Sequence, residues 1–238
     1  MFSAGQRNIS NDLRLLDNLF TEGNEIRNIN LKTALISLPL IVSAILFSKY
    51  FLDDWIALRA MEILRSSDLL SIGTSDIPDL LATVVVIVCA LFWGRYIVLK
   101  RHGTVGEQML CCKVVGTAVP MAFFLKWPFK FTFGRLNTRI WLISHASDKF
   151  HWFQRGEHYD SFPSGHMMVF AAFFAALWFF YPCWRSIFAG LTLILALTLV
   201  ATDYHFFSDV IAGAYLGLFV TLLTLFFFNS SKQSQAER

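Results

Sequence analysis

Residues 161–181 read SFPSGHMMVFAAFFAALWFFY, a polar segment that runs without a break into the apolar stretch Met167–Tyr181. A helix needs roughly 20 apolar residues to cross the hydrocarbon core of a bilayer, so this stretch predicts a short membrane-spanning helix. Five other segments have the same character: Ala34–Phe51, Leu80–Leu99, Met109–Phe129, Ile187–Tyr204 and Asp209–Phe228. The sequence therefore predicts an all-α fold, a six-span transmembrane helical bundle.

The composition of the whole chain agrees with a membrane protein. Of its 238 residues, 55% are hydrophobic and 16% are charged, and the mean hydropathy is +0.53. An ordinary soluble domain has about 25% charged residues, so the balance excludes a soluble globular domain and a disordered chain. The net charge is only +3 and the basic residues are scattered, which excludes the basic patch of a nucleic-acid-binding protein.

Two segments between the predicted spans carry further structure. Phe51–Ser71 has apolar residues at near-helical spacing with charged residues between them, which indicates an amphipathic helix that lies on the membrane surface or packs against other spans. The connection from Thr138 to Phe162 is longer than most unstructured connections, and connections of that length are usually functional. Lys113 and Lys126 lie near the ends of the third span, where long side chains reach the interface.

Three polar clusters are expected at one face of the membrane. The third span ends in 126–135, the fourth begins after 161–166, and 203–209 joins the fifth span to the sixth. Successive spans alternate in direction, so these three clusters meet at the same face. Ionisable residues in a span are costly and are usually functional, which makes this face the predicted site.

His205 and Asp209 are the first candidate pair in these clusters. They are four residues apart, so on a helix they share one face. A carboxylate there can keep one imidazole nitrogen protonated and leave the other free to attack as a nucleophile. The alternative is a histidine that is merely satisfied by a neighbouring carboxylate.

The segment Pro163–His166 is the second candidate. Proline suits the first turn of a helix, glycine allows a ligand close to the backbone, and the free amides of a helix start bind anions. His166 is a candidate proton donor to a leaving oxygen. The alternative is a capped helix start without a ligand.

Lys130 and Arg135 provide the positive charge that phosphoryl transfer requires. Each alone is more typical of an interfacial anchor of a span than of a phosphate ligand. Their convergence with the two other clusters at one face favours a phosphate site.

These residues resemble the motifs of the type-2 phosphatidic acid phosphatase superfamily, which are K-x6-R-P, P-S-G-H and S-R-x5-H-x3-D. The second motif is intact as Pro163–His166, and the H-x3-D of the third is intact as His205–Asp209. The latter runs on to Gly213 as in bacterial members. The resemblance covers about 126–217, and the six-span layout fits the family.

Two arginines of the family motifs are absent at their usual positions. Asn137 and Thr138 stand where the first motif has arginine and proline, and Thr198 and Leu199 stand where the third has serine and arginine. The remainder of the first motif, K-x3-G-R from 130 to 135, follows a spelling common among bacterial members. Two basic side chains are candidates for substitute clamps on the phosphate: Arg139 and Arg155.

The resemblance implies a metal-free mechanism through a phosphohistidine, without a cofactor. In it, His205 attacks phosphorus, Asp209 orients His205, and His166 protonates the leaving oxygen. The equatorial oxygens are held by the remaining motif residues: Lys130, Arg135, Ser164 and the amide of Gly165. The histidines between 138 and 162 (His145, His151 and His158) match no compact metal-ligand spacing.

The predicted function is that of a membrane lipid phosphatase acting on a lipid phosphate or diphosphate. The candidate substrates are an isoprenyl diphosphate, phosphatidate or phosphatidylglycerophosphate, and a lipid A phosphate, because the motifs address only the phosphoryl group. Two alternatives stay open: a lipid phosphotransferase that uses the same phosphohistidine, and a non-catalytic phospholipid-binding or transport protein.

The chain divides into an N-terminal cytoplasmic segment (1–31), a six-helix membrane domain (32–229, with its catalytic core at about 126–217) and a C-terminal polar tail (230–238). Six spans place both termini on one side. The distribution of Lys and Arg favours the cytoplasm for that side once the basic residues at the site are set apart. The expected location is a bacterial inner membrane, with the active site facing the periplasm.

Overall fold

The computed structural model describes residues 31–66, 77–103, 106–144, 146, 149–154, 156 and 158–236. Within these ranges the regular structure is helical, and the only β-type pairing is an isolated bridge between Arg135 and Phe150. The predicted all-α class is confirmed. The N-terminal segment 1–30 and the candidate clamp Arg155 lie outside the described residues.

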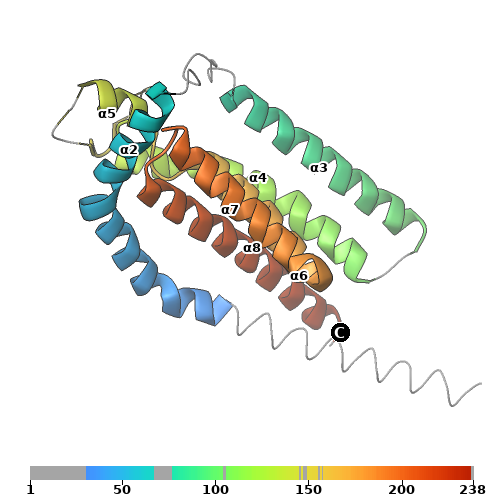
Figure 1. Cartoon of the computed structure of the whole chain (residues 1–238). Coiled ribbons are helices and arrows are strands. Elements are labelled where there is room, and N and C mark those ends of the chain that lie inside the picture. Colours follow the sequence, from blue (N-terminus) through green and yellow to red (C-terminus); the bar gives the residue numbers. More distant parts are fainter. Residues whose placement is uncertain are drawn as a thin grey trace, which may run out of the picture.

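The helices follow one another with short connections (Figure 1). In chain order they are a helix over 31–47, the π-helical η1 (Ser48–Leu52), α2 (Asp53–Ser66), α3 (Ile77–Arg101), α4 (Glu107–Phe133), α5 (Thr138–Ser144), α6 (Gly165–Phe180), the 3-10 turn η3 (Pro182–Trp184), α7 (Arg185–Ala201) and α8 (Phe207–Ala236).

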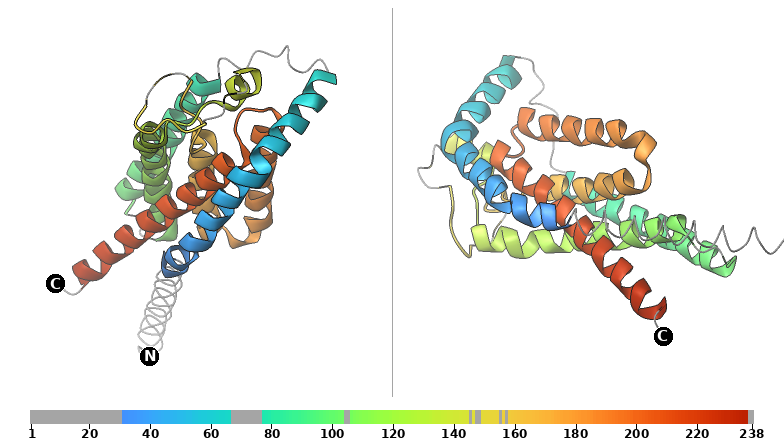
Figure 2. Two further views of the ribbon diagram at one scale, coloured as in Figure 1. Left: turned by 90° about the vertical axis from the view of Figure 1, so that its left-hand side faces the viewer. Right: turned by 90° about the horizontal axis from the view of Figure 1, so that it is seen from below.

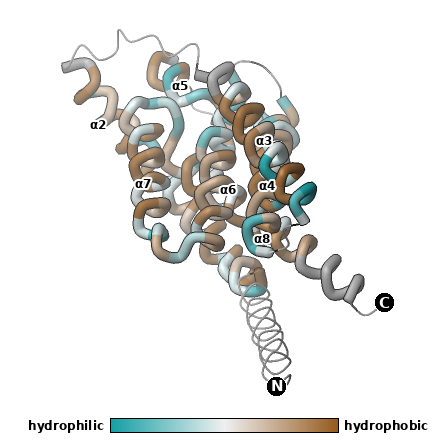
Figure 3. The backbone as a smooth tube through the Cα atoms, turned by 90° about the vertical axis from the view of Figure 1, so that its right-hand side faces the viewer, coloured by the Kyte–Doolittle hydropathy of each residue, from teal (hydrophilic) through white to brown (hydrophobic). Residues whose placement is uncertain are grey.

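Five of these helical stretches are long and apolar enough to cross a membrane: Leu31–Leu64, Leu81–Arg101, Glu107–Phe133, Pro182–Ala201 and Phe207–Phe228. The fourth predicted span corresponds to α6, which has 16 residues and is therefore about 24 Å long, shorter than a typical bilayer core. The outer faces carry many exposed large apolar side chains, such as Ile36 and Leu40, and hydrophobic residues dominate the helices (Figure 3). Exposed apolar surface on this scale indicates contact with lipid.

Helix α6 lies at the centre of the bundle, against α4, α7 and α8. Figure 2 shows α6 and α7 side by side as a helical hairpin. Two glycines of α8 permit its close approach to α6. A Cβ at Gly213 would lie 2.6 Å from the carbonyl oxygen of Ser164, and one at Gly217 would overlap the backbone of Met168. This close contact brings the first turn of α8 against the first turn of α6.

Helix α2 continues the first span without a break through η1, and it lies with α5 at one end of the bundle (Figure 1). It contacts α5, α7 and α8, and its Asp53 and Ala57 are buried. Of the two possibilities that the sequence left open for this segment, packing against other spans is the one observed over 53–66. The connection after 138 is also ordered in part, because α5 buries Trp141 and Leu142.

Candidate active site

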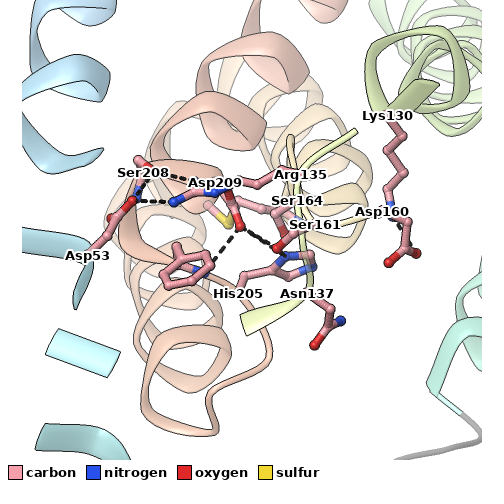
Figure 4. Close-up of polar contacts among 12 residues, drawn as sticks. Asp53, Lys130, Arg135, Asn137, Asp160, Ser161, Ser164, His205, Ser208 and Asp209 are labelled. Carbon is pink, nitrogen blue, oxygen red and sulfur yellow. Dashed lines mark hydrogen bonds and ion pairs between the residues drawn. The ribbon is translucent and has the colours of Figure 1, made fainter. Parts of the chain in front are cut away.

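The three predicted clusters come together at the end of the bundle that α2 and α5 cover. The last two turns of α4, the start of α6 and the connection between α7 and α8 provide them (Figure 4). The amide of Ser164 donates to the backbone oxygen of Asp209 at 3.1 Å, and the ring centroids of His166 and His205 are 6.4 Å apart. Both candidate histidines therefore border one small region.

His205 is oriented by Asp209 and by Ser161. Its Nδ1 lies 3.6 Å from Asp209 Oδ2 and 3.4 Å from Ser161 Oγ, and the Ser161 hydroxyl donates to Asp209 Oδ2 at 2.6 Å. Because both partners lie at Nδ1, Nε2 is the nitrogen left for chemistry. The predicted pairing is present, although His205 precedes α8 and does not belong to it. The connection itself holds the pair, since Asp209 Oδ2 accepts from the amide of Phe206 at 3.2 Å and His205 N donates to Leu199 O.

Burial lowers the pKa of His205 below that of an ordinary histidine, and the carboxylate of Asp209 opposes this shift. The side chain is 4% exposed. A buried imidazole with a lowered pKa is neutral at neutral pH. It therefore keeps the lone pair that a nucleophile needs.

The segment 163–166 forms the start of α6, as the sequence predicts. Ser164 is the N-cap, and its side-chain oxygen accepts from the amide of Met167 at 3.3 Å. His166 packs edge-on against Tyr204 with 5.3 Å between ring centroids. Gly165 is crowded by two lysine side chains of α4, because a Cβ there would lie 2.9 Å from Lys126 Cδ and 3.7 Å from Lys130 Cε.

The two lysines supply positive charge over the start of α6. Lys130 Nζ lies 3.3 Å from Asp160 Oδ2. Lys126, one helical turn earlier, is buried and holds its Nζ 3.9 Å from the ring centroid of Phe123. Sequence reasoning treated Lys126 as an interfacial side chain. The signal that it missed is the four-residue spacing from Lys130, which places both on one face of α4.

Arg135 is fully buried between two carboxylates (Figure 4). Nη2 donates to Asp53 Oδ2 at 2.6 Å, and Nη1 donates to Ser208 Oγ at 2.6 Å and to Asp209 Oδ1. Gly134 allows the turn that places it there, since its φ is +48° and a Cβ would overlap the backbone of His151. The sequence predicts that the guanidinium of Arg135 binds phosphate, whereas in the structure it contacts the carboxylate of Asp209, which orients His205.

The candidate clamp Arg139 lies beside the connection between α7 and α8. Its Nη2 donates to the backbone oxygen of Thr202 at 3.0 Å, and its guanidinium is 5.6 Å from the ring centroid of Tyr204. Leu199, at the position of a family arginine, is buried and packs with Met167 and Val210. This position contributes to the core of the bundle.

Sequence reasoning did not find Asp53, Asp160 or Ser161 as site residues. Asp53 and Arg135 are 82 positions apart, so no local pattern relates them. Among the residues that the structure describes, no three His, Cys, Asp or Glu side chains are grouped as a potential metal site.

Comparison with known proteins gives one family and two relatives. A model of the PAP2 superfamily matches residues 110–232. A lipid A 1-phosphatase of Rhizobium johnstonii is 41% identical over 70 residues, 29% of each chain, and one of Rhizobium etli is 42% identical over 66 residues, 28% of each chain. The match thus spans less than a third of the length of these relatives. No solved structure matches the chain.

Proposed function

The chain belongs to the PAP2 superfamily, and we propose that it is a membrane enzyme that hydrolyses a lipid phosphate or diphosphate through a phosphohistidine. The observation that carries the proposal is the buried pair of His205 and Asp209 beside the start of α6. This pair combines a neutral nucleophile with its orienting carboxylate. The amides of the helix start and the two lysines next to it are positive and so complement the negative charge of a phosphoryl group.

In the first step, the lone pair of His205 Nε2 forms a bond to phosphorus and the bond from phosphorus to the lipid oxygen breaks. His166 gives its proton to that oxygen, so a monophosphate releases the lipid as a neutral alcohol and a diphosphate releases it as the lipid monophosphate. In the second step, His166 takes a proton from water as the water oxygen attacks phosphorus. The phosphorus–nitrogen bond breaks, its electron pair returns to His205, and phosphate is released.

The equatorial oxygens are held by the backbone amides at the start of α6, the hydroxyl of Ser164 and the ammonium of Lys130. Asp160 already pairs with this ammonium. An incoming phosphate replaces the carboxylate of Asp160 as the anionic partner of Lys130. No step requires a metal ion. We propose Lys126 as the second cation that contacts the phosphate, because its side chain lies beside Gly165 together with the side chain of Lys130.

A cavity beside the site suits the apolar part of a lipid. It has a volume of about 820 Å³ and is lined largely by apolar side chains of the first helix, α6, α7 and α8. At one end it reaches Met167, next to His166, and farther along it is lined by Trp178 and Leu218. Because the two matched relatives are named lipid A 1-phosphatases, a lipid A phosphate is the first substrate to test.

The proposed setting is the inner membrane of a bacterium, with α6 as the short fourth of six spans. Both termini then lie in the cytoplasm and the site faces the periplasm. The apolar outer surface and the lengths of the helices support the membrane setting.

Phosphate release by the detergent-purified full chain tests the proposed function. The substrates are a lipid A 1-phosphate, phosphatidate, phosphatidylglycerophosphate and an isoprenyl diphosphate, each with a chelator present throughout. We expect inorganic phosphate from at least one of them at the same rate with and without chelator. Transfer of phosphate to a second lipid without release would instead identify a phosphotransferase. Tight binding without turnover of any substrate would identify a binding protein.

Replacing Lys126 with methionine is expected to lower kcat/KM by about 10- to 100-fold, since a hydrogen bond to a charged group contributes about 1.5–3 kcal/mol. The matched control is Lys113→Met, because Lys113 lies roughly 20 Å away along the same helix and contacts the ring of Tyr96. Steady-state kinetics of both variants on one substrate measure the effect. Equal kcat/KM for the two variants would remove Lys126 from the phosphate site.

A further inference from the structure

We infer that Asp53 is a positioning residue of this site, which acts through Arg135 and Ser208 to fix the carboxylate of Asp209 and, through it, His205. The inference rests on the proposed function, because it assigns Asp209 the task of orienting the nucleophile. It extends the site to α2, which lies outside the segment 110–232 that the family model matches.

Asp53 is held by three hydrogen bonds in the interior. Oδ2 accepts from Arg135 Nη2 at 2.6 Å and from the Ser208 hydroxyl at 2.5 Å, and Oδ1 accepts from the amide of Ser208 at 2.9 Å. The residue is 1% exposed. The carboxylate thus bridges the end of α4 and the first turn of α8 (Figure 4).

The two oxygens of Asp209 have separate tasks. Oδ1 accepts from Arg135, whereas Oδ2 accepts from Ser161 and from the amide of Phe206 and faces His205. This division keeps one oxygen at the nucleophile.

Arg135 would not maintain that division alone. A guanidinium and a carboxylate favour a bidentate pair, with two parallel N–H···O bonds. Asp53 already occupies Nη2 of Arg135, so Asp209 pairs with Nη1 only. Without Asp53, both nitrogens of Arg135 draw on the carboxylate of Asp209 and pull Oδ2 away from His205, against the contacts from Ser161 and the Phe206 amide. Asp53 therefore sets the orientation of Asp209 by competing for the same cation.

The neighbouring Asp54 has none of these contacts. Its side chain is 53% exposed and pairs with Lys149. Exposed ion pairs contribute little to stability. Asp54 is thus a control that matches Asp53 in chemistry, in helix and in sequence position.

The experiment compares Asp53→Asn with Asp54→Asn in the full detergent-purified chain, on the lipid that the wild type hydrolyses best. For Asp53→Asn we expect kcat to fall about 10-fold, the lower end of the range for partners that directly orient a reacting ligand, because Asp53 acts on His205 only through Arg135 and Asp209, with little change in KM. For Asp54→Asn we expect both constants to stay at the wild-type value. Thermal unfolding and size-exclusion profiles report the folded fraction of each variant.

The pH profile distinguishes positioning from a merely structural role. The charged and titratable groups around His205 are Asp209, Lys130, Asp160, His166 and Tyr204. When Oδ2 of Asp209 moves away, the imidazolium form of His205 loses its carboxylate and its pKa falls further. The acid limb of kcat/KM therefore shifts to lower pH in Asp53→Asn. Partial unfolding would reduce the rate at every pH and leave the limb in place.

Two further variants keep the inference falsifiable. Ser208→Ala removes only the hydroxyl between Asp53 and Arg135. We expect it to shift the acid limb of kcat/KM to lower pH as well, so this variant tests the inference even where Asp53→Asn does not fold. Asp53→Asn combined with Arg135→Gln removes both charges, and we expect it to stay impaired. Wild-type kcat and pH profile in folded Asp53→Asn, an unshifted limb in Ser208→Ala, or recovery of activity in the double variant would overturn the inference. An inactive wild type would instead refute the proposed function, and the inference with it.

Discussion

Replacing His205 with alanine is expected to lower kcat by about 10⁴-fold or more, the scale on which loss of a covalent nucleophile acts. His205 is the group whose Nε2 attacks phosphorus, whereas its Nδ1 faces Asp209 and Ser161. A water molecule in its place is a weaker nucleophile than the imidazole nitrogen and is not held in a fixed position. Phosphate release with the best lipid substrate measures the loss.

The control for this variant is His158→Ala, which removes an exposed histidine from the connection between α5 and α6. We expect its rate to equal that of the wild type. A His205→Ala protein that is folded and retains even a tenth of the wild-type rate would exclude His205 as the nucleophile.

His166→Ala is the second variant with a large expected effect, about 10²- to 10⁴-fold on a lipid substrate. His166 lies at the start of α6, 6.4 Å from His205 between ring centroids, where it can protonate the departing oxygen. A lipid alkoxide is a poor leaving group and needs that proton. A nitrophenolate leaves readily without it.

The dependence on the leaving group separates the acid from the nucleophile. In the first turnover on p-nitrophenyl phosphate, before the step in which His166 acts as the base, we expect His166→Ala to release p-nitrophenolate at close to the wild-type rate, while His205→Ala loses release of the leaving group from both substrates. Equal first-turnover losses of His166→Ala on the ester and the lipid would show that His166 does not act as the acid.

The sequence predicts the parts of the site that local spacing encodes. The helix start near residues 163–166 follows from their order, although Ser164 is the N-cap and Pro163 precedes it instead of lying in the first turn. The pairing of His205 with Asp209 follows from their separation by four. The reason for the second pairing differs from the expected one, because His205 lies in the connection before α8. The two residues do not share a helical face. Instead, the carboxylate of Asp209 folds back to accept from the amide of Phe206, which places it beside His205.

Contacts between distant segments were not predictable in this way. Arg135 carries the charge expected of a phosphate ligand, yet its surroundings are two buried carboxylates, one of them on α2. In the sequence, Asp53 is one of several charged residues between apolar ones. Its burial depends on the continuation of the first span into α2, which the spacing of apolar residues leaves undetermined.

The missing family arginines have different surroundings in the structure. Leu199 is buried in a cluster with Met167 and Val210, so an arginine there would need a different core. Asn137 accepts from the amide of Arg139 at 3.0 Å and serves the turn before α5. Lys126 is the cation we propose in compensation, because its side chain lies beside Gly165 at the start of α6, next to that of Lys130.

Chemical trapping of the phosphoenzyme tests the central claim most directly. The full chain is mixed with a lipid substrate that carries labelled phosphate, quenched within milliseconds and analysed for protein-bound label. We predict a label that is labile in acid and stable in base, that maps to His205 and that is absent from His205→Ala. Turnover without any trapped label in the wild type, or the same label in His205→Ala, would contradict a phosphohistidine mechanism at this residue.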